Sequence, residues 1–139
     1  MRVEPYLYFD GRCDQAIEFY GRAVGAEVIV IVRFKDAPDA QPRPGNENKV
    51  MHVALRIGES TVLASDGQCR GSPRFEGFSL SIAAASDGEA ERVFAALSEG
   101  GRVQVQMMPT GFASRFGMVS DRFGVLWTIV AQQGAAAKA

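Results

Sequence analysis

Histidine and cysteine are scarce in this chain, which has one histidine and two cysteines among its 139 residues. Cys13 and Cys69 stand far apart and in different contexts, without the close spacing of a metal site. We therefore expect two free thiols in a reducing cytoplasm. His52 is the one imidazole available to any site.

The chain also has no excess of charge of either sign and no long apolar run. The 15 basic and 16 acidic residues nearly cancel, which argues against a basic surface for nucleic acid or anionic membranes. No apolar run approaches the ~20 residues of a membrane span, and the first residues enter a strand pattern without the apolar segment of a signal peptide. We expect a cytoplasmic protein with no nucleic-acid or membrane partner.

Strand and helix patterns follow the same order in both halves of the chain. The first half predicts, in turn, a strand at 3–9, a helix at 13–24 ending at Gly25, and strands at 27–35, 49–57 and 60–65. The second half predicts a strand at 78–83, a helix opened by Ser86 and Glu89 as a capping box, and strands at 102–108, 114–120 and 125–131. The repeated strand–helix–strand–strand–strand order indicates an α+β fold of two βαβββ modules.

The domain boundaries follow from this repeat. We expect one domain over 1–133, with module one at 1–67 and module two at 76–133, and a flexible tail at 134–139. A single ferredoxin-like α+β domain with extra strands is the alternative. Residues 36–48 hold three prolines and almost nothing apolar, so they are either a lid over a ligand site or a plain connector.

Residues 112–127 are the most informative stretch, because they predict two strands joined by an Asp-Arg-Phe-Gly turn at 121–124. Together with the stretches at 5–20, 52–58 and 63–66, this hairpin resembles the PhnB-like branch of the vicinal oxygen chelate (glyoxalase/bleomycin-resistance/dioxygenase) superfamily. Thr110-Gly111-Phe112 departs from the Thr-Phe-Trp of that branch. The resemblance implies mixed sheets that form a cleft, and a homodimer.

Metal-dependent members of that superfamily bring His and Glu ligands from four strands into the cleft. By resemblance, those positions fall in this chain at Pro5, Leu63 or Ala64, Gly77 or Phe78, and Trp127 or Thr128. None of these side chains is a competent ligand for a metal that polarises a substrate oxygen. We therefore expect no metal and no other cofactor. An atypical site built from His52 and distant carboxylates is the alternative.

Alternation along residues 50–57 separates the two faces of that strand. Met51, Val53, Leu55 and Ile57 should pack on the helices, so that His52 and Arg56 point toward the cleft. His52 could there act as a general base or anchor a polar ligand. It could equally be satisfied by a neighbouring strand or a dimer contact.

Further candidates for ligand contact each have a structural alternative. They are Asp66, Phe78, Phe112, Phe116 and Trp127. Asp66 also fits an ordinary turn, the aromatic residues also fit the core, and Asp121 reads as structural. Tyr6 and Tyr8, which alternate with Pro5, are predicted on the helix side.

The sequence therefore favours a metal-free small-molecule binding protein of unknown ligand. The alternative is an enzyme of the glyoxalase/dioxygenase superfamily, of lyase or isomerase type, that uses His52 as an acid or base. A methyltransferase label sometimes given to the branch finds no glycine-rich nucleotide motif in the chain.

Overall fold

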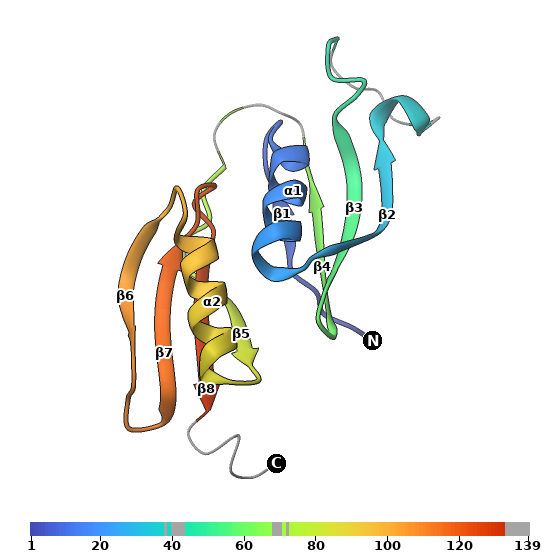
Figure 1. Cartoon of the computed structure of the whole chain (residues 1–139). Coiled ribbons are helices and arrows are strands. Elements are labelled where there is room, and N and C mark those ends of the chain that lie inside the picture. The colour runs from blue at the N-terminus through green and yellow to red at the C-terminus, as the bar shows by residue number, and fades with distance from the viewer. Residues whose placement is uncertain (38, 40–43, 68–70, 72, 133–139) are drawn as a thin grey trace. The chain divides into compact units, whose positions relative to one another are not determined.

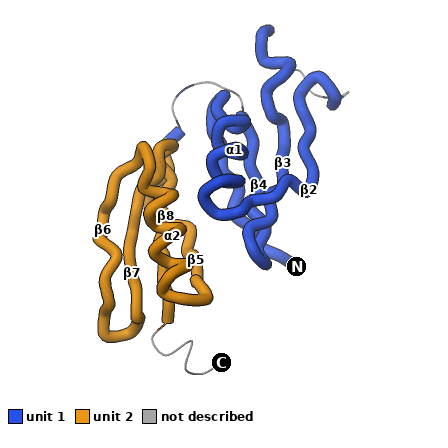
Figure 2. Tube along the Cα trace, viewed as in Figure 1, with its two compact units in different colours: residues 1–73 blue, residues 74–139 orange. Residues whose placement is uncertain are grey.

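The computed structural model describes residues 1–37, 39, 44–67, 71 and 73–132. The chain divides into two compact units, residues 1–73 and 74–139 (Figure 2). Each unit has its own sheet and its own α-helix.

Unit 1 contains a mixed four-stranded sheet and one α-helix (Figure 1). Its elements are β1 (Tyr6–Tyr8), α1 (Cys13–Val24), β2 (Glu27–Arg33), a 3₁₀ turn at Phe34–Asp36, β3 (Val50–Ile57) and β4 (Ser60–Ser65). The strands lie in the order β1-β4-β3-β2, with β1 parallel to β4 and the other pairs antiparallel.

Unit 2 repeats this topology. Its elements are β5 (Leu80–Ala84), α2 (Asp87–Ser98), β6 (Arg102–Met108), β7 (Ala113–Ser120) and β8 (Leu126–Gln132). The strands lie in the order β5-β8-β7-β6, again with the first strand parallel to the last. The predicted α+β fold of two βαβββ modules is confirmed, and two separate sheets rule out the single ferredoxin-like arrangement.

The local signals for helix ends act as predicted. Gly25 closes α1 with φ of 70° and donates its N–H to the carbonyl of Tyr20, a left-handed conformation that costs glycine little. Ser86 Oγ accepts the N–H of Glu89 at 3.1 Å, and the Glu89 carboxylate accepts the N–H of Ala85 at 2.8 Å. These contacts satisfy backbone donors around the first turn of α2.

Each sheet buries the face that its own helix covers. In unit 1 the buried residues include Leu7, Phe9, Ala16, Phe19, Tyr20, Val53 and Leu55. In unit 2 they include Val93, Phe94, Leu97, Val119, Trp127 and Ile129. At Gly117, a Cβ atom would come within 2.8 Å of a Phe94 ring carbon, so this position must lack a side chain for α2 to pack so close.

Several predicted boundaries need correction or cannot be compared. β2 ends at Arg33 rather than at residue 35, because Phe34–Asp36 turn into a 3₁₀ helix. That helix includes the first residue of the segment 36–48, which the sequence left as either a lid or a connector. Residues 38 and 40–43 of this segment, Cys69, and the tail at 134–139 lie outside the described residues. No helix in the described ranges is long and apolar enough to cross a membrane.

Candidate functional site

The side chain of His52 lies on the face of the unit 1 sheet that α1 leaves uncovered. Its neighbour Val53 is completely buried on the opposite face, where α1 packs against β3. Because side chains alternate along a strand, Ala54 and Arg56 share the face of His52. The predicted separation of the two faces of β3 holds for Val53 and Leu55, which are buried.

Tyr6 and Tyr8 lie on this same open face, contrary to the prediction. The Tyr6 hydroxyl is hydrogen-bonded to His52 Nδ1 at 2.8 Å, while Leu7 and Phe9 point into the core. The prediction was wrong because it took Pro5 as facing the cleft, and a shift of one residue turns every side chain of a strand to the other face.

The two tyrosines and the histidine form one aromatic cluster. The rings of Tyr6 and Tyr8 are stacked, with centroids 5.0 Å apart and planes inclined by 22°. The centroid of the His52 ring lies 5.6 Å from that of Tyr6. Tyr6 reaches His52 across β4, where Ser65 pairs with Tyr8 and offers only a small side chain. We call Tyr6, Tyr8 and His52 the aromatic triplet.

The surroundings of Tyr6 determine the protonation of its phenol. Burial raises the pKa of the Tyr6 phenol, the neighbouring Tyr8 raises it further, and a hydrogen bond with Ser65 opposes the shift. The phenol therefore keeps its proton at neutral pH and can donate it to Nδ1 of a neutral imidazole. When the phenol donates to Nδ1, the Nε2 atom of His52 is the ring nitrogen that can offer an N–H to another molecule.

Arg56 lies four residues beyond His52 on β3, and its side chain is exposed. In the sheet it stands across from Glu27 on one side and Thr61 on the other. It offers a fixed positive charge on the open face, at some distance along the strand from the triplet.

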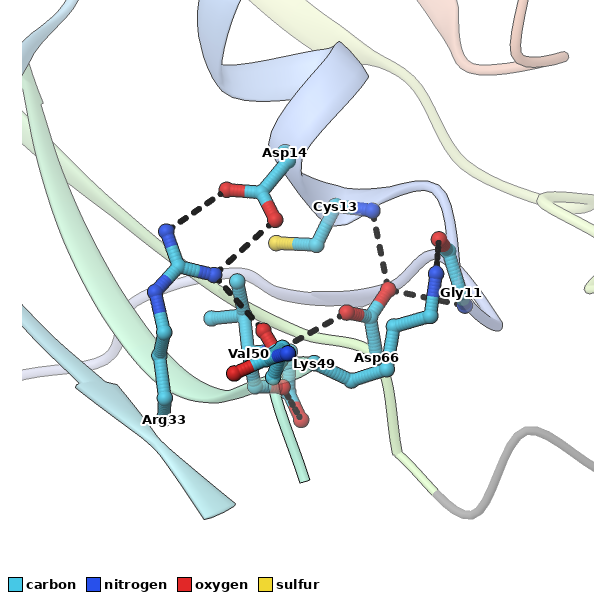
Figure 3. A network of polar contacts seen from close by, with 9 residues as sticks. Gly11, Cys13, Asp14, Arg33, Lys49, Val50 and Asp66 are labelled. Carbon is cyan, nitrogen blue, oxygen red and sulfur yellow. Dashed lines mark hydrogen bonds and ion pairs between the residues drawn. The ribbon is translucent and has the colours of Figure 1, made fainter. Parts of the chain in front are cut away.

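Asp66 works inside the fold of unit 1. Its carboxylate is buried and accepts backbone N–H groups from Gly11 at 2.7 Å, Cys13 at 2.8 Å and Val50 at 2.9 Å (Figure 3). These contacts tie the start of α1 to the start of β3. Of the two interpretations of Asp66, the contacts favour the structural one.

Cys13 sits beside this carboxylate and is fully buried. Burial raises the pKa of its thiol strongly, and the adjacent Asp66 raises it further. A thiol held in its neutral form is a poor nucleophile, so Cys13 belongs to the core and not to a reactive site.

Trp127 and Asp121 form a comparable buried hydrogen-bond network in unit 2. The Trp127 indole N–H donates to Asp121 Oδ2 at 2.9 Å, and Asp121 Oδ1 accepts the N–H groups of Phe123 at 2.8 Å and Val125 at 3.1 Å. Trp127 is buried on the α2 face of the sheet, which favours its interpretation as a core residue. The contacts of Asp121 agree with its expected structural role.

Phe112 and Phe116 are brought together on the face of unit 2 that α2 leaves uncovered. Their rings meet edge to face with centroids 5.6 Å apart, and Phe112 is 65% exposed. Met108 pairs with Phe116 across β6 and β7 and is also exposed. Phe78 is exposed as well, just before β5. Of the predicted ligand residues, His52 and Arg56 thus lie on the open face of unit 1, Phe112 and Phe116 on that of unit 2, while Asp66 and Trp127 are buried.

The positions that resemble metal-ligand positions hold no ligand group. Just before β1, the carbonyl of Pro5 accepts the N–H of Leu63 on β4 at 2.9 Å, so two of these positions lie next to each other. In the part of the chain that the structure describes, no three His, Cys, Asp or Glu side chains gather closely enough to hold a metal ion. The expectation of a metal-free protein remains a prediction for elemental analysis.

Comparison with known proteins supplies the family. A family model described as 3-demethylubiquinone-9 3-methyltransferase matches residues 1–130. Protein YjdN of Escherichia coli (strain K12) is 33% identical over 138 residues, which cover 93% of this chain and 94% of that protein.

Solved structures show the same fold. Protein PA1353 from Pseudomonas aeruginosa superposes with a TM-score of 0.85 at 37% identity, covering 96% of this chain and 98% of its own. The PhnB protein from Bacillus cereus gives a TM-score of 0.78 at 22% identity over 94% and 99%. A glyoxylase/bleomycin resistance protein/dioxygenase domain from Frankia sp. EAN1pec gives 0.62 at 12% identity over 96% and 98%, which bears on the fold alone.

Proposed function

Because this chain belongs to the family described as 3-demethylubiquinone-9 3-methyltransferase, with the PhnB-like glyoxalase/bleomycin-resistance fold, we propose that it binds a small planar organic molecule without a metal. The observation that supports this most directly is the Tyr6–His52 hydrogen bond beside the stacked Tyr6–Tyr8 pair.

The aromatic triplet suits a ligand with a flat ring and a hydrogen-bond acceptor. Aromatic rings stack on tyrosine at 4.5–7 Å between centroids with a gain of about 0.5–1.5 kcal/mol. The outward N–H of His52 would orient a carbonyl or carboxylate of the ligand, and Arg56 would favour a negative charge. This combination of apolar walls and a few polar anchors is typical of small-molecule sites.

The other residues predicted to contact the ligand differ in whether they are accessible or buried. Phe78, Phe112 and Phe116 belong to unit 2 and keep accessible surface, so we retain them as candidate apolar contacts of that unit alone. Asp66 and Trp127 are buried in the cores of their own units, where we propose that they help to hold each unit folded. A homodimer in the cytoplasm, without nucleic-acid or membrane partners, completes the proposal.

Proton transfer by His52 is a second candidate function. The hydrogen bond from Tyr6 to Nδ1 would hold one tautomer of the imidazole, as an orienting group does for a general base. Methyl transfer, which the family description names, needs a site for the methyl donor. The first strand-to-helix turn, Asp10-Gly11-Arg12, has a single glycine and gives little support to a nucleotide-like donor.

Ligand-observed NMR tests the binding proposal. We would screen benzoate, naphthoate and indole carboxylates, with their amides, against the wild type, Tyr6→Phe and His52→Gln. Arg22→Gln, on the exposed last turn of α1, is the matched control. Binding should weaken in both site variants and persist in the control. Equal binding by all four proteins would place the ligand elsewhere, and turnover lost only in His52→Gln would favour proton transfer.

A further inference from the structure

The strand β2 is an apolar edge. Figure 1 shows it as the outermost strand of unit 1, with β3 on one side only. Consecutive apolar residues along it keep 38% to 51% of their surface exposed, and they are Val28, Ile29, Val30 and Ile31. Since neighbours on a strand point to opposite faces, apolar surface is open on both faces of this edge.

Exposed apolar edge strands are normally protected against pairing with other chains. Natural proteins place lysine, another charged residue or proline within an exposed edge strand to prevent pairing with other chains. In β2 the charges stand only at its ends, with Glu27 at the start and Arg33 at the finish, and the exposed Lys35 and Asp36 follow. The other edge strand that follows a helix, β6, interleaves its apolar residues with Gln104 and Gln106, so it is less suited to an apolar contact.

We propose that β2 pairs with β2 of a second copy of this chain, antiparallel, and joins the two unit 1 sheets. The inference rests on the proposed homodimer and names its interface. In an antiparallel pair, Glu27 of one copy meets the basic end of β2 in the other, and the reverse contact follows by symmetry. A parallel pair would instead place like charges side by side at both ends, which is unfavourable.

The second copy is favoured over a foreign strand by this self-complementarity. The apolar middle of the strand meets the same apolar middle, and the acidic end meets the basic end. Arg33 is already bound to Asp14 through two hydrogen bonds of 2.9 and 3.0 Å. The exposed Lys35 side chain is therefore more available than Arg33 for an ion pair with Glu27 of the second copy.

The pairing register is left open by the shape of the strand. β2 has register shifts against β3 between Val28 and Val30 and between Val32 and Arg33. Such irregularities bend a strand and shift its side chains between faces. A symmetric antiparallel pair has its axis at the middle of the strand, near Ile29, Val30 or Ile31. Because the register is open, the experiment must scan these three positions.

Sedimentation velocity on the full chain provides the first test. Val30→Lys places a charge in the middle of the edge, twice in each dimer, and should raise the dimer dissociation constant at least about tenfold. Val103→Lys is the matched control on β6, where the wild-type side chain is 41% exposed. Circular dichroism confirms that both variants are folded, as their exposure leads us to expect.

Disulfide trapping provides the second test. Ile29→Cys, Val30→Cys and Ile31→Cys are made singly in a Cys69→Ser background and oxidised in air, while the buried Cys13 should not react. At least one variant should form a linked dimer, because a disulfide needs Cβ atoms only 3.5–4.5 Å apart.

The outcomes separate the interface from the rest of the proposal. A monomeric wild type overturns both the homodimer and this interface, without bearing on the ligand test. A dimer that survives Val30→Lys and gives no linked species shows that the copies meet elsewhere. A dimer weakened only by Val103→Lys would assign the interface to β6.

Discussion

Removing the Asp66 carboxylate should destabilise unit 1 more than any exposed substitution in it. The group accepts at least three backbone N–H bonds, from Gly11, Cys13 and Val50. Hydrogen bonds to a charged acceptor contribute about 1.5–3 kcal/mol each, and a buried donor left unpaired costs about 1–3 kcal/mol. Because the Gly11 N–H is only partly buried and can bond to water once the carboxylate is gone, we expect Asp66→Ala to lower the free energy of unfolding by about 3–5 kcal/mol.

The isosteric variant refines this expectation. Asp66→Asn can keep one oxygen for Gly11 and Cys13, but it turns an NH₂ group toward the N–H of Val50 in place of Oδ2. One bond is lost and two donors face each other, so the cost should be about 2–3 kcal/mol. Asp14→Asn, which breaks only the exposed ion pair with Arg33, should cost less than about 1 kcal/mol.

Urea unfolding followed by far-UV circular dichroism measures these differences. Asp121→Ala serves as the parallel variant in unit 2, where the carboxylate also accepts three N–H bonds. If the two units unfold separately, each alanine variant should shift a different transition. The reasoning is refuted if Asp66→Asn is no less stable than Asp14→Asn.

Four further predictions concern packing, reactivity, pH and metal content. Gly117→Ala should cost about 1–3 kcal/mol, because the new Cβ would lie 2.8 Å from Phe94; adding Phe94→Leu should recover part of the loss in the same urea assay. Ellman's reagent should leave Cys13 unmodified in the native protein at pH 8, since burial raises the pKa of its thiol; rapid modification there would contradict its placement. The pKa of the Tyr6 phenol is raised in the folded protein, so its contribution to stability is complete below its pKa in the unfolded chain, about 10, and is lost as pH rises through its pKa in the folded protein. The free energy of unfolding, measured in urea, should therefore fall less steeply above this pH in Tyr6→Phe than in the wild type. Elemental analysis should find no stoichiometric Zn, Fe, Mn or Ni in the purified protein; about one ion per chain would overturn that expectation.

Local signals allowed most of the fold to be predicted from the sequence. Gly25 ends α1 and Ser86 opens α2 because the conformation and hydrogen bonds that they need involve only a few neighbouring residues. The Asp121–Gly124 turn is local in the same way, with the Gly124 N–H donating to the Asp121 carbonyl at 2.9 Å. Repetition of these signals, separated by apolar strand patterns, was sufficient for the βαβββ repeat.

The face of β1 and the partner of His52 depended on the tertiary structure. Three residues of strand carry too little alternation to show which side is buried, so the choice between Tyr6 and Leu7 is made by packing against α1. The hydrogen bond between Tyr6 and His52 joins residues 46 positions apart, across the intervening strand β4. Asp66 likewise gains its role from backbone N–H groups on two other segments. Contacts of this kind arise from sheet register and chain crossover, which a local pattern of residues does not contain.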